Sequence, residues 1–238
     1  MPNAAWENRV SRRNFLFGTY THRCKAYVDR AFYAGLRKTV HPARADVYLT
    51  VDNSPSRRYA RSLKKRFGDF SEFEHLDIPG QRTARATFLN NVAVSANRLR
   101  QRLLASDCDH LVTIESDVLV PPDLPWLLEE AVSRLDALGE NWGAVGGLYY
   151  GFHHPALSDP DDERLLRSDE VFSGCTCYNR PLLEGLRFRW SPEDVRPFPD
   201  AWIKHDAQEH GYSTWLYNKI KCRHVRGWWI PFLWSRFG

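Results

Sequence analysis

Two acidic residues stand where a strongly apolar segment ends, and this placement is the first indication of chemistry in the sequence. The segment Leu111–Ile114 is followed directly by Glu115, Ser116 and Asp117. A carboxylate at the end of a buried strand loses hydration unless something compensates its charge. A divalent cation that also binds a diphosphate is a natural partner, because such hard ions take oxygen ligands from carboxylates and phosphates. A second interpretation stays open, in which these carboxylates cap the helix that begins after residue 123.

The elements that must position these residues alternate between strands and helices through the first half of the chain. β-Branched and aromatic runs bounded by turn residues predict strands, and apolar residues at a spacing of about 3.6 predict helices. We expect the first strand to end at Gly18, so that Thr19 and Tyr20 lie in a loop from which a helix starts. The predicted strands are 14–18, 46–51, 73–78 and 110–114, and the predicted helices run from about 21 to 36, 57 to 67 and 82 to 106.

This alternation predicts an α/β fold with a Rossmann-like, mainly parallel sheet and helices on both faces. Ligands bind such sheets at the carboxyl ends of the strands, where this sequence has Thr19, Tyr20, Asp52 and residues 115–117. The second half adds a helix over 124–138, a strand over 143–149 and a polar loop over 152–170, which is a candidate lid. We expect one domain with two halves, about 14–120 and about 121–238.

Composition narrows the class of protein. The chain has 238 residues, of which 43% are hydrophobic and 26% charged, as is typical of soluble globular proteins. No apolar run approaches the roughly 20 residues that cross a bilayer, and the first residues lack the layout of a signal peptide. We therefore expect a cytoplasmic protein without a transmembrane segment. The five scattered cysteines favour reduced thiols, with Cys175 and Cys177 buried rather than bound to zinc.

The net charge of +4 is unevenly distributed. Residues 1–110 contain 20 Lys and Arg against 10 acidic residues, whereas residues 111–238 contain 13 against 19. The basic run from Arg57 to Arg66 falls at helical spacing and is either a solvated helix face or a patch for an anionic partner. The segment 226–237 has five aromatic residues among two arginines. Such a segment suits binding to a polynucleotide or to an anionic membrane surface, or it closes a core or a dimer contact. No pattern specifies an oligomeric state.

Several segments resemble GT-A fold glycosyltransferases of the family-2 type. Asp109–Val118, followed by two prolines, resembles the part of that family with its Asp-x-Asp metal motif. Pro199–Tyr212 resembles the family's second signature, in which an acidic residue opens an amphipathic helix that ends in Gly and an aromatic residue. His224 lies at the position where a histidine completes the metal site in many such enzymes. Together the similar segments extend over about residues 14–225. The further segments that resemble this family are Phe17–Tyr20, Val51–Ser54, Ala96–Arg98, Val171–Cys175 and Asn179–Leu183.

The resemblance implies metal-dependent transfer of a hexosyl group from a nucleotide-diphosphate sugar to an acceptor hydroxyl. It implies that Asp117 and His224 bind Mn²⁺ or Mg²⁺ and that Asp200 is the general base, which gives inversion at the anomeric carbon. The chain departs from the family's pattern in having Glu115 at the first acidic position and Pro199 before Asp200. The implied donor-binding residues are Thr19, Tyr20, Asp52, Asn97, Arg98, Glu115 and Ser116. The resemblance makes about 14–120 the nucleotide-sugar-binding half and about 121–238 the acceptor-side half.

Two alternatives for the base region stay open. Asp200 is also a candidate N-cap for a helix over 201–211. His205 with Asp206 is a second candidate acid-base pair.

Alternatives for the function stay open as well. The sequence lacks G-x-x-x-x-G-K-[ST] and G-x-G-x-x-G, so it does not fit P-loop or dinucleotide-binding enzymes. For the acceptor, the resemblance favours a saccharide or a lipid-linked sugar. A hydroxylated base in DNA is the second expectation, favoured by the basic first half. A non-catalytic module that binds sugar or nucleic acid is the alternative from another class.

Overall fold

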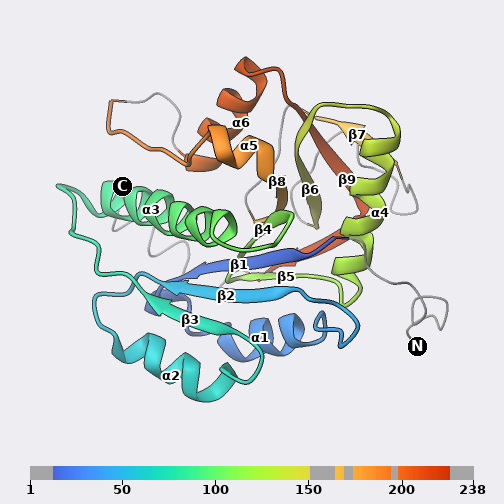
Figure 1. Ribbon diagram of the computed structural model, residues 1–238. Helices are drawn as coiled ribbons and strands as arrows, with labels where there is room; N and C mark the ends of the chain where they lie inside the picture. Colours follow the sequence, from blue (N-terminus) through green and yellow to red (C-terminus); the bar gives the residue numbers. More distant parts are fainter. Residues whose placement is uncertain (1–12, 151–163, 169–173, 194–197, 226–238) are drawn as a thin grey trace.

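The computed structural model describes residues 13–150, 164–168, 174–193 and 198–225 (Figure 1). In chain order the elements are β1 (Phe15–Thr21), the 3₁₀ helix η2 (Arg23–Lys25), α1 (Asp29–Arg37), β2 (Val47–Asp52), α2 (Arg58–Phe67), β3 (Glu72–His75), α3 (Ala84–Leu104), β4 (His110–Glu115), β5 (Val118–Leu119), α4 (Leu124–Ala137), β6 (Trp142–Tyr150), β7 (Leu165–Arg167), β8 (Cys175–Asn179), α5 (Arg180–Gly185), α6 (Pro199–Glu209) and β9 (Ser213–His224).

A nine-stranded sheet organises the described part of the chain. Its order is β3-β2-β1-β4-β8-β6-β9-β5, and β7 pairs with β9. The strands β3, β2, β1 and β4 are parallel, β8 is antiparallel to its neighbours β4 and β6, and β9 is parallel to β6. Because Thr21 pairs with Asp52 and Tyr20 with Glu115, the polar ends of three strands meet at one edge.

Helices cover both faces of this sheet, which confirms the predicted α/β architecture. Figure 1 shows α1 and α2 below the sheet and α3, α5 and α6 above it. Two separate hydrophobic clusters fill the two layers. Strand β1 contributes to both: Phe15 and Phe17 pack toward α1 and α4, while Leu16 and Tyr20 pack toward α3. This alternation follows from the two-residue period of a strand.

The prediction that β1 ends at Gly18 is wrong, and so is the loop predicted for Thr19 and Tyr20. The strand continues through Gly18 to Thr21. A Cβ atom at Gly18 would lie 2.7 Å from Cδ1 of Leu99, on helix α3. Glycine is therefore present because α3 packs closely against the strand, not because the strand stops. The helix expected to start near residue 21 begins instead at Asp29, after the short turn η2.

Most other predicted elements are confirmed with small shifts at their ends. The strands β2, β3 and β4, the helices α2, α3 and α4, and the strand β6 all occupy the predicted segments. Cys175 and Cys177 are free and buried in β8, as expected. Of the predicted loop 152–170, residues 165–167 form β7, and residues 152–163 and 169–170 lie outside the described residues, as does the aromatic and basic segment 226–237. None of the helices in the described ranges has the length and apolar character of a membrane span.

Candidate metal and donor site

Three side chains at the carboxyl edge of the sheet form a potential metal site. One ligand atom from each of Glu115, Asp117 and His224 lies within 4.8 Å of the others. The short ladder between β5 and β9 brings them together: Val118 pairs with His224, and the N–H of Val225 donates to the carbonyl oxygen of Asp117 at 2.7 Å. The structure thus brings the predicted ligands Asp117 and His224 into one cluster, together with Glu115.

The donor set of this cluster suits Mn²⁺ or Mg²⁺. Two carboxylates supply the oxygen ligands that these ions prefer. The imidazole nitrogen is a softer ligand, which favours a transition-metal ion such as Mn²⁺ over Mg²⁺. Asp117 is buried, and Nδ1 of His224 is buried without a hydrogen-bond partner among the described residues. The two carboxylates, together with an imidazole whose buried nitrogen is unused by the described residues, therefore fit a divalent ion.

Lys25 is the residue of this cluster that the sequence analysis missed. Its Nζ lies 2.7 Å from Oδ1 of Asp117. Burial alone lowers the pKa of Lys25, but the charges of Glu115 and Asp117 outweigh that effect and raise it. Lys25 is one of 33 Lys and Arg residues in the chain, and nothing in its sequence context separates it from the others. The ammonium group therefore balances part of the carboxylate charge.

Three hydroxyl side chains near the same edge differ in whether they are available to a ligand: Tyr20, Ser116 and Thr19. The hydroxyl of Tyr20 donates to Oε1 of Glu115 at 3.4 Å. Oγ of Ser116 is buried and has no partner within the described part of the chain. Thr19 is 1% exposed inside β1, between Thr50 and Ile114. Ser116 therefore has a hydrogen-bonding group to offer a ligand, whereas Thr19 is part of the sheet framework.

Asp52 ends β2 and is completely buried. Its Oδ1 accepts hydrogen bonds from the backbone N–H and the hydroxyl of Ser54, and its Oδ2 lies 2.9 Å from Nδ1 of His75. The Ser54 hydroxyl oxygen also accepts from the N–H of Arg23 at 2.8 Å. Asp52 thus ties together the turn after β1, the loop after β2 and the end of β3.

Asn97 and Arg98 are both engaged in contacts within the protein. The amide of Asn97 donates to the carbonyl oxygen of Phe188 at 2.5 Å and accepts from its N–H at 3.1 Å. Arg98 donates through Nε to Glu74 at 2.5 Å. These bonds tie α3 to the segment after α5 and to β3. In this structure both side chains hold these elements together, and any contact with a sugar donor would be additional to these hydrogen bonds.

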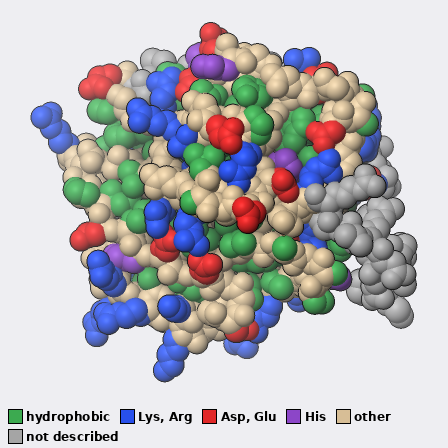
Figure 2. All heavy atoms as spheres, in the orientation of Figure 1, with side chains coloured by type: hydrophobic (Ala, Val, Ile, Leu, Met, Phe, Trp, Pro, Cys, Tyr) green, Lys and Arg blue, Asp and Glu red, His purple; other side chains and the backbone are tan. Residues whose placement is uncertain are grey.

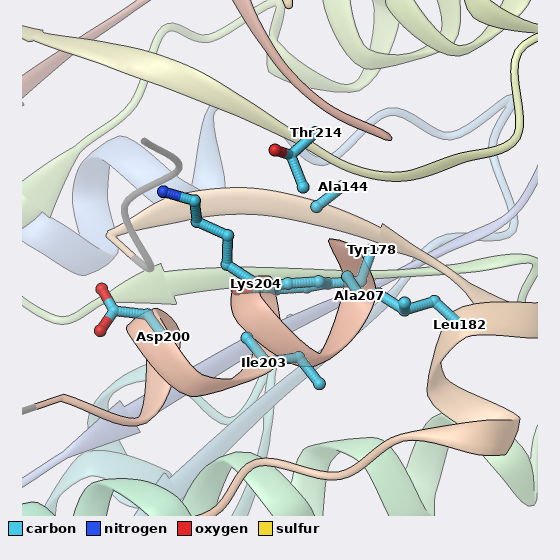
Figure 3. Close-up of a pocket in the computed structure, with 8 residues that line it drawn as sticks. All are labelled: Ala144, Tyr178, Leu182, Asp200, Ile203, Lys204, Ala207 and Thr214. Carbon is cyan, nitrogen blue, oxygen red and sulfur yellow. The ribbon is translucent and has the colours of Figure 1, made fainter. Parts of the chain in front are cut away.

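Asp200 lines a small pocket between α6 and the sheet (Figure 3). Asp200 and Lys204 project from successive turns of α6 toward the same side, and Tyr178 on β8 lies beside them (Figure 3). Burial raises the pKa of Tyr178, and the nearby charge of Asp200 raises it further. The N-cap of α6 is Phe198 and Asp200 lies in the first turn, so the interpretation of Asp200 as N-cap is wrong.

The alternative pair His205 and Asp206 lies on the same helix, with Nδ1 of His205 3.4 Å from Oδ1 of Asp206. Asp206 accepts two hydrogen bonds from the guanidinium group of Arg189, at 2.8 and 2.9 Å. These bonds lower the pKa of Asp206, against the opposing effect of burial. Arg189 also stacks on Trp202, with its Cζ 3.6 Å from the ring centre. Asp206 thus joins His205 to Arg189 in a surface cluster, whereas Asp200 lines the small pocket beside α6.

No family model and no curated protein sequence matches this chain. Its fold, however, matches solved GT-A glycosyltransferases. A mannosyltransferase from Pyrobaculum calidifontis, in complex with GDP-Man and Mn²⁺, is 18% identical with a TM-score of 0.63, over 94% of this chain and 60% of that one. The TarS 1–349 structure from S. aureus is 10% identical with a TM-score of 0.60, over 89% and 60%.

GalNAc-T7 with UDP, GalNAc and Mn²⁺ is a third match, 10% identical with a TM-score of 0.62, over 90% of this chain and 44% of that one. The chain spans about 60% or less of the length of these structures. At such low identity the likeness establishes the fold, which is GT-A, as predicted.

Proposed function

We propose that this chain is a metal-dependent glycosyltransferase that moves a hexosyl group from a nucleotide-diphosphate sugar to an acceptor hydroxyl, with inversion. The observation that carries the proposal is the cluster of Glu115, Asp117 and His224 at the carboxyl edge of a GT-A sheet. Structural neighbours with the same fold were solved with GDP-Man and Mn²⁺ and with UDP-GlcNAc. Both the cluster and the fold suit a donor whose leaving group is a diphosphate.

Asp117 and His224 are the proposed metal-binding residues, with Glu115 beside them. A divalent ion held there would supply Lewis-acid stabilisation of the negative charge on the departing diphosphate, an effect worth several kcal/mol. Ser116 and Tyr20 are proposed to bind the donor through their hydroxyl groups. Asp52 is proposed to order the loops around the nucleoside. Thr19, Asn97 and Arg98 would contribute to the donor site through the framework contacts that they make.

Asp200 is proposed as the general base. As the acceptor oxygen forms its bond to the anomeric carbon, the carboxylate accepts the hydroxyl proton, and the bond to the nucleotide diphosphate breaks. A base at hydrogen-bond distance contributes about 10²–10⁴-fold to such a reaction. The pocket that Asp200 lines with Tyr178 and Lys204 is the proposed approach for the acceptor. A single displacement from the face opposite the leaving group inverts the anomeric centre.

The proposed acceptor is a saccharide or a lipid-linked sugar. A hydroxylated base in DNA is a second candidate, because the exposed face of α2 is strongly basic. Figure 2 shows Lys and Arg side chains gathered at the lower left, over α2. The exposed basic residues of this helix and its N-cap are Arg57, Arg58, Arg61, Lys64, Lys65 and Arg66.

A mobility-shift titration with duplex DNA at several salt concentrations separates these acceptors. In a plot of the logarithm of the binding constant against the logarithm of the salt concentration, each phosphate contact contributes a slope of about −0.9. Replacing Arg58, Arg61 and Lys65 with Gln should make the slope less steep by the contribution of about two to three contacts. Absence of a shift at low salt would remove the DNA candidate. A saccharide acceptor predicts no such shift.

The decisive test of the function is metal-dependent hydrolysis of a panel of UDP-, GDP- and TDP-sugars. We expect one donor to release its nucleotide in the presence of Mn²⁺ or Mg²⁺, and Asp117→Asn to reduce release by at least about 10²-fold. Asp123→Asn is the matched control, since Asp123 is an exposed carboxylate close in sequence that makes no capping hydrogen bond. A protein that only binds sugar or nucleic acid would release no nucleotide from any donor. Unchanged release by Asp117→Asn would refute the site.

A further inference from the structure

A lysine ammonium group lies inside the cluster that we assign to metal binding. Nζ of Lys25 is 2.7 Å from Oδ1 of Asp117, while Nε2 of His224 is 3.7 Å from Oδ2 of the same carboxylate. The side chain of Asp117 is 5% exposed and that of Lys25 is 22% exposed. Each oxygen of the central carboxylate therefore faces a nitrogen from another element, and the ammonium group occupies a cation's position.

The backbone around Lys25 directs it to this position. Lys25 ends the turn η2, and its N–H donates to the carbonyl oxygen of His22 at 2.8 Å. Within the same turn, the N–H of Arg23 donates to Oγ of Ser54 at 2.8 Å, and Ser54 in turn donates to the buried carboxylate of Asp52. The turn is thus fixed to the ends of β1 and β2, and Lys25 reaches Asp117 from a rigid base.

The charges of the cluster oppose simultaneous binding of this ammonium group and a metal ion. Glu115 and Asp117 supply two negative charges, and Lys25 supplies one positive charge. A divalent ion on Asp117 would lie within a few ångströms of the ammonium group, where repulsion at a protein-like dielectric weakens binding roughly tenfold or more. A diphosphate changes this balance, because it offers oxygens to the ammonium group on its flexible four-carbon stem.

Building on the proposed function, we propose that Lys25 competes with the divalent metal for Asp117 and moves to the donor diphosphate when the nucleotide binds. The metal alone then binds weakly. Metal and nucleotide strengthen each other's binding by the same factor, as linkage requires. Lys25 is thereby the residue that couples donor binding to metal binding, and it is not itself a metal ligand.

Titration calorimetry with Mn²⁺ tests this coupling, first with the ion alone and then with UDP, GDP or TDP present. Lys25→Met keeps the length of the stem and removes the charge. We expect Mn²⁺ alone to bind Lys25→Met at least about tenfold more tightly than the wild type, which equals about 1.4 kcal/mol. The gain in Mn²⁺ affinity that the nucleotide produces in the wild type should fall at least about tenfold in this variant.

Two further variants serve as controls. Lys25→Arg keeps the positive charge and should keep the weak binding of Mn²⁺ alone. Arg23→Met removes an equal charge from the same turn, but Arg23 is exposed, so screening by water and salt should leave Mn²⁺ affinity within about twofold of the wild type.

Equal or weaker binding of Mn²⁺ alone to folded Lys25→Met would overturn the proposal. If that variant does not fold, Lys25→Gln replaces it, and the wild type gives a second test: a nucleotide that binds without raising Mn²⁺ affinity would also overturn the proposal. If none of UDP, GDP and TDP binds any variant in the presence of Mn²⁺, the proposed donor class fails. The titrations with Mn²⁺ alone still decide whether Lys25 and the ion compete.

Discussion

Replacing Gly18 with Ala should destabilise the protein through a collision with Leu99. The added Cβ would lie 2.7 Å from Cδ1 and 3.1 Å from Cγ of a side chain that is completely buried. Overpacking of this kind costs about 1–3 kcal/mol. The upper half of that range applies where the neighbour cannot rotate away, and Leu99 is enclosed in the cluster between α3 and the sheet.

A double-mutant cycle separates this collision from a general effect of alanine. Leu99→Ala alone should cost about 2–5 kcal/mol, because it opens a cavity. In the double variant the new methyl group of residue 18 enters that cavity. The combined loss should therefore be smaller than the sum of the two single losses, by at least about 1 kcal/mol.

Urea unfolding followed by circular dichroism measures the three free energies of unfolding. Gly35→Ala is the matched control, since a Cβ there meets nothing within 4 Å. In helix α1 that change should be neutral or stabilising. If the losses of Gly18→Ala and Leu99→Ala were simply additive, the close packing would not explain why glycine stands in the middle of β1.

Three further predictions concern pH, catalysis and the second half of the sheet. Burial lowers the pKa of His110 to about 4; since the unfolded state takes up this proton near pH 6.5, stability should fall by about 2–3 kcal/mol from pH 7 to 4. His110→Phe should lose that part of the pH dependence in urea unfolding, and an unchanged slope would contradict this assignment. Asp200→Asn should bind donor normally in calorimetry but lose at least about 10² in turnover, whereas the exposed Glu209→Gln on the same helix should not; normal transfer by Asp200→Asn would point to another base or to retention. Gly147→Ala should cost about 1–3 kcal/mol or more in thermal unfolding, because its Cβ would lie 2.9 Å from the backbone oxygen of Ile220; an unchanged melting temperature would contradict the close approach of β6 and β9.

The pattern of strands and helices predicted most of the fold, because the apolar residues of each element recur with a clear period. The sequence also placed Asp52 and Glu115 correctly at strand ends, since buried β-branched runs stop visibly at polar residues. Gly18 shows where this reasoning fails. A glycine in a strand is ambiguous between a strand end and a close contact, and only the position of α3 distinguishes the two.

The residues of the candidate site that belong to ordered motifs could be predicted from the sequence. A residue that belongs to no motif could not. Asp117 and His224 were paired through the resemblance, and the structure brings them together. Lys25 could not be singled out, because its role depends on the turn η2 that separates β1 from α1, and the sequence pattern suggested a continuous helix there. Asn97 and Arg98 matched a motif, but tertiary contacts use their side chains for packing.

The short pairing of β5 with β9 makes the metal site depend on the last strand of the sheet. Glu115 ends β4 and Asp117 follows two residues later, so both carboxylates reach this edge without the last strand. A chain in which β9 has not docked has both carboxylates but lacks the imidazole of His224, which arrives only when β9 pairs with Val118. On the proposed function, donor hydrolysis that needs this imidazole should therefore recover during refolding only after β9 has docked.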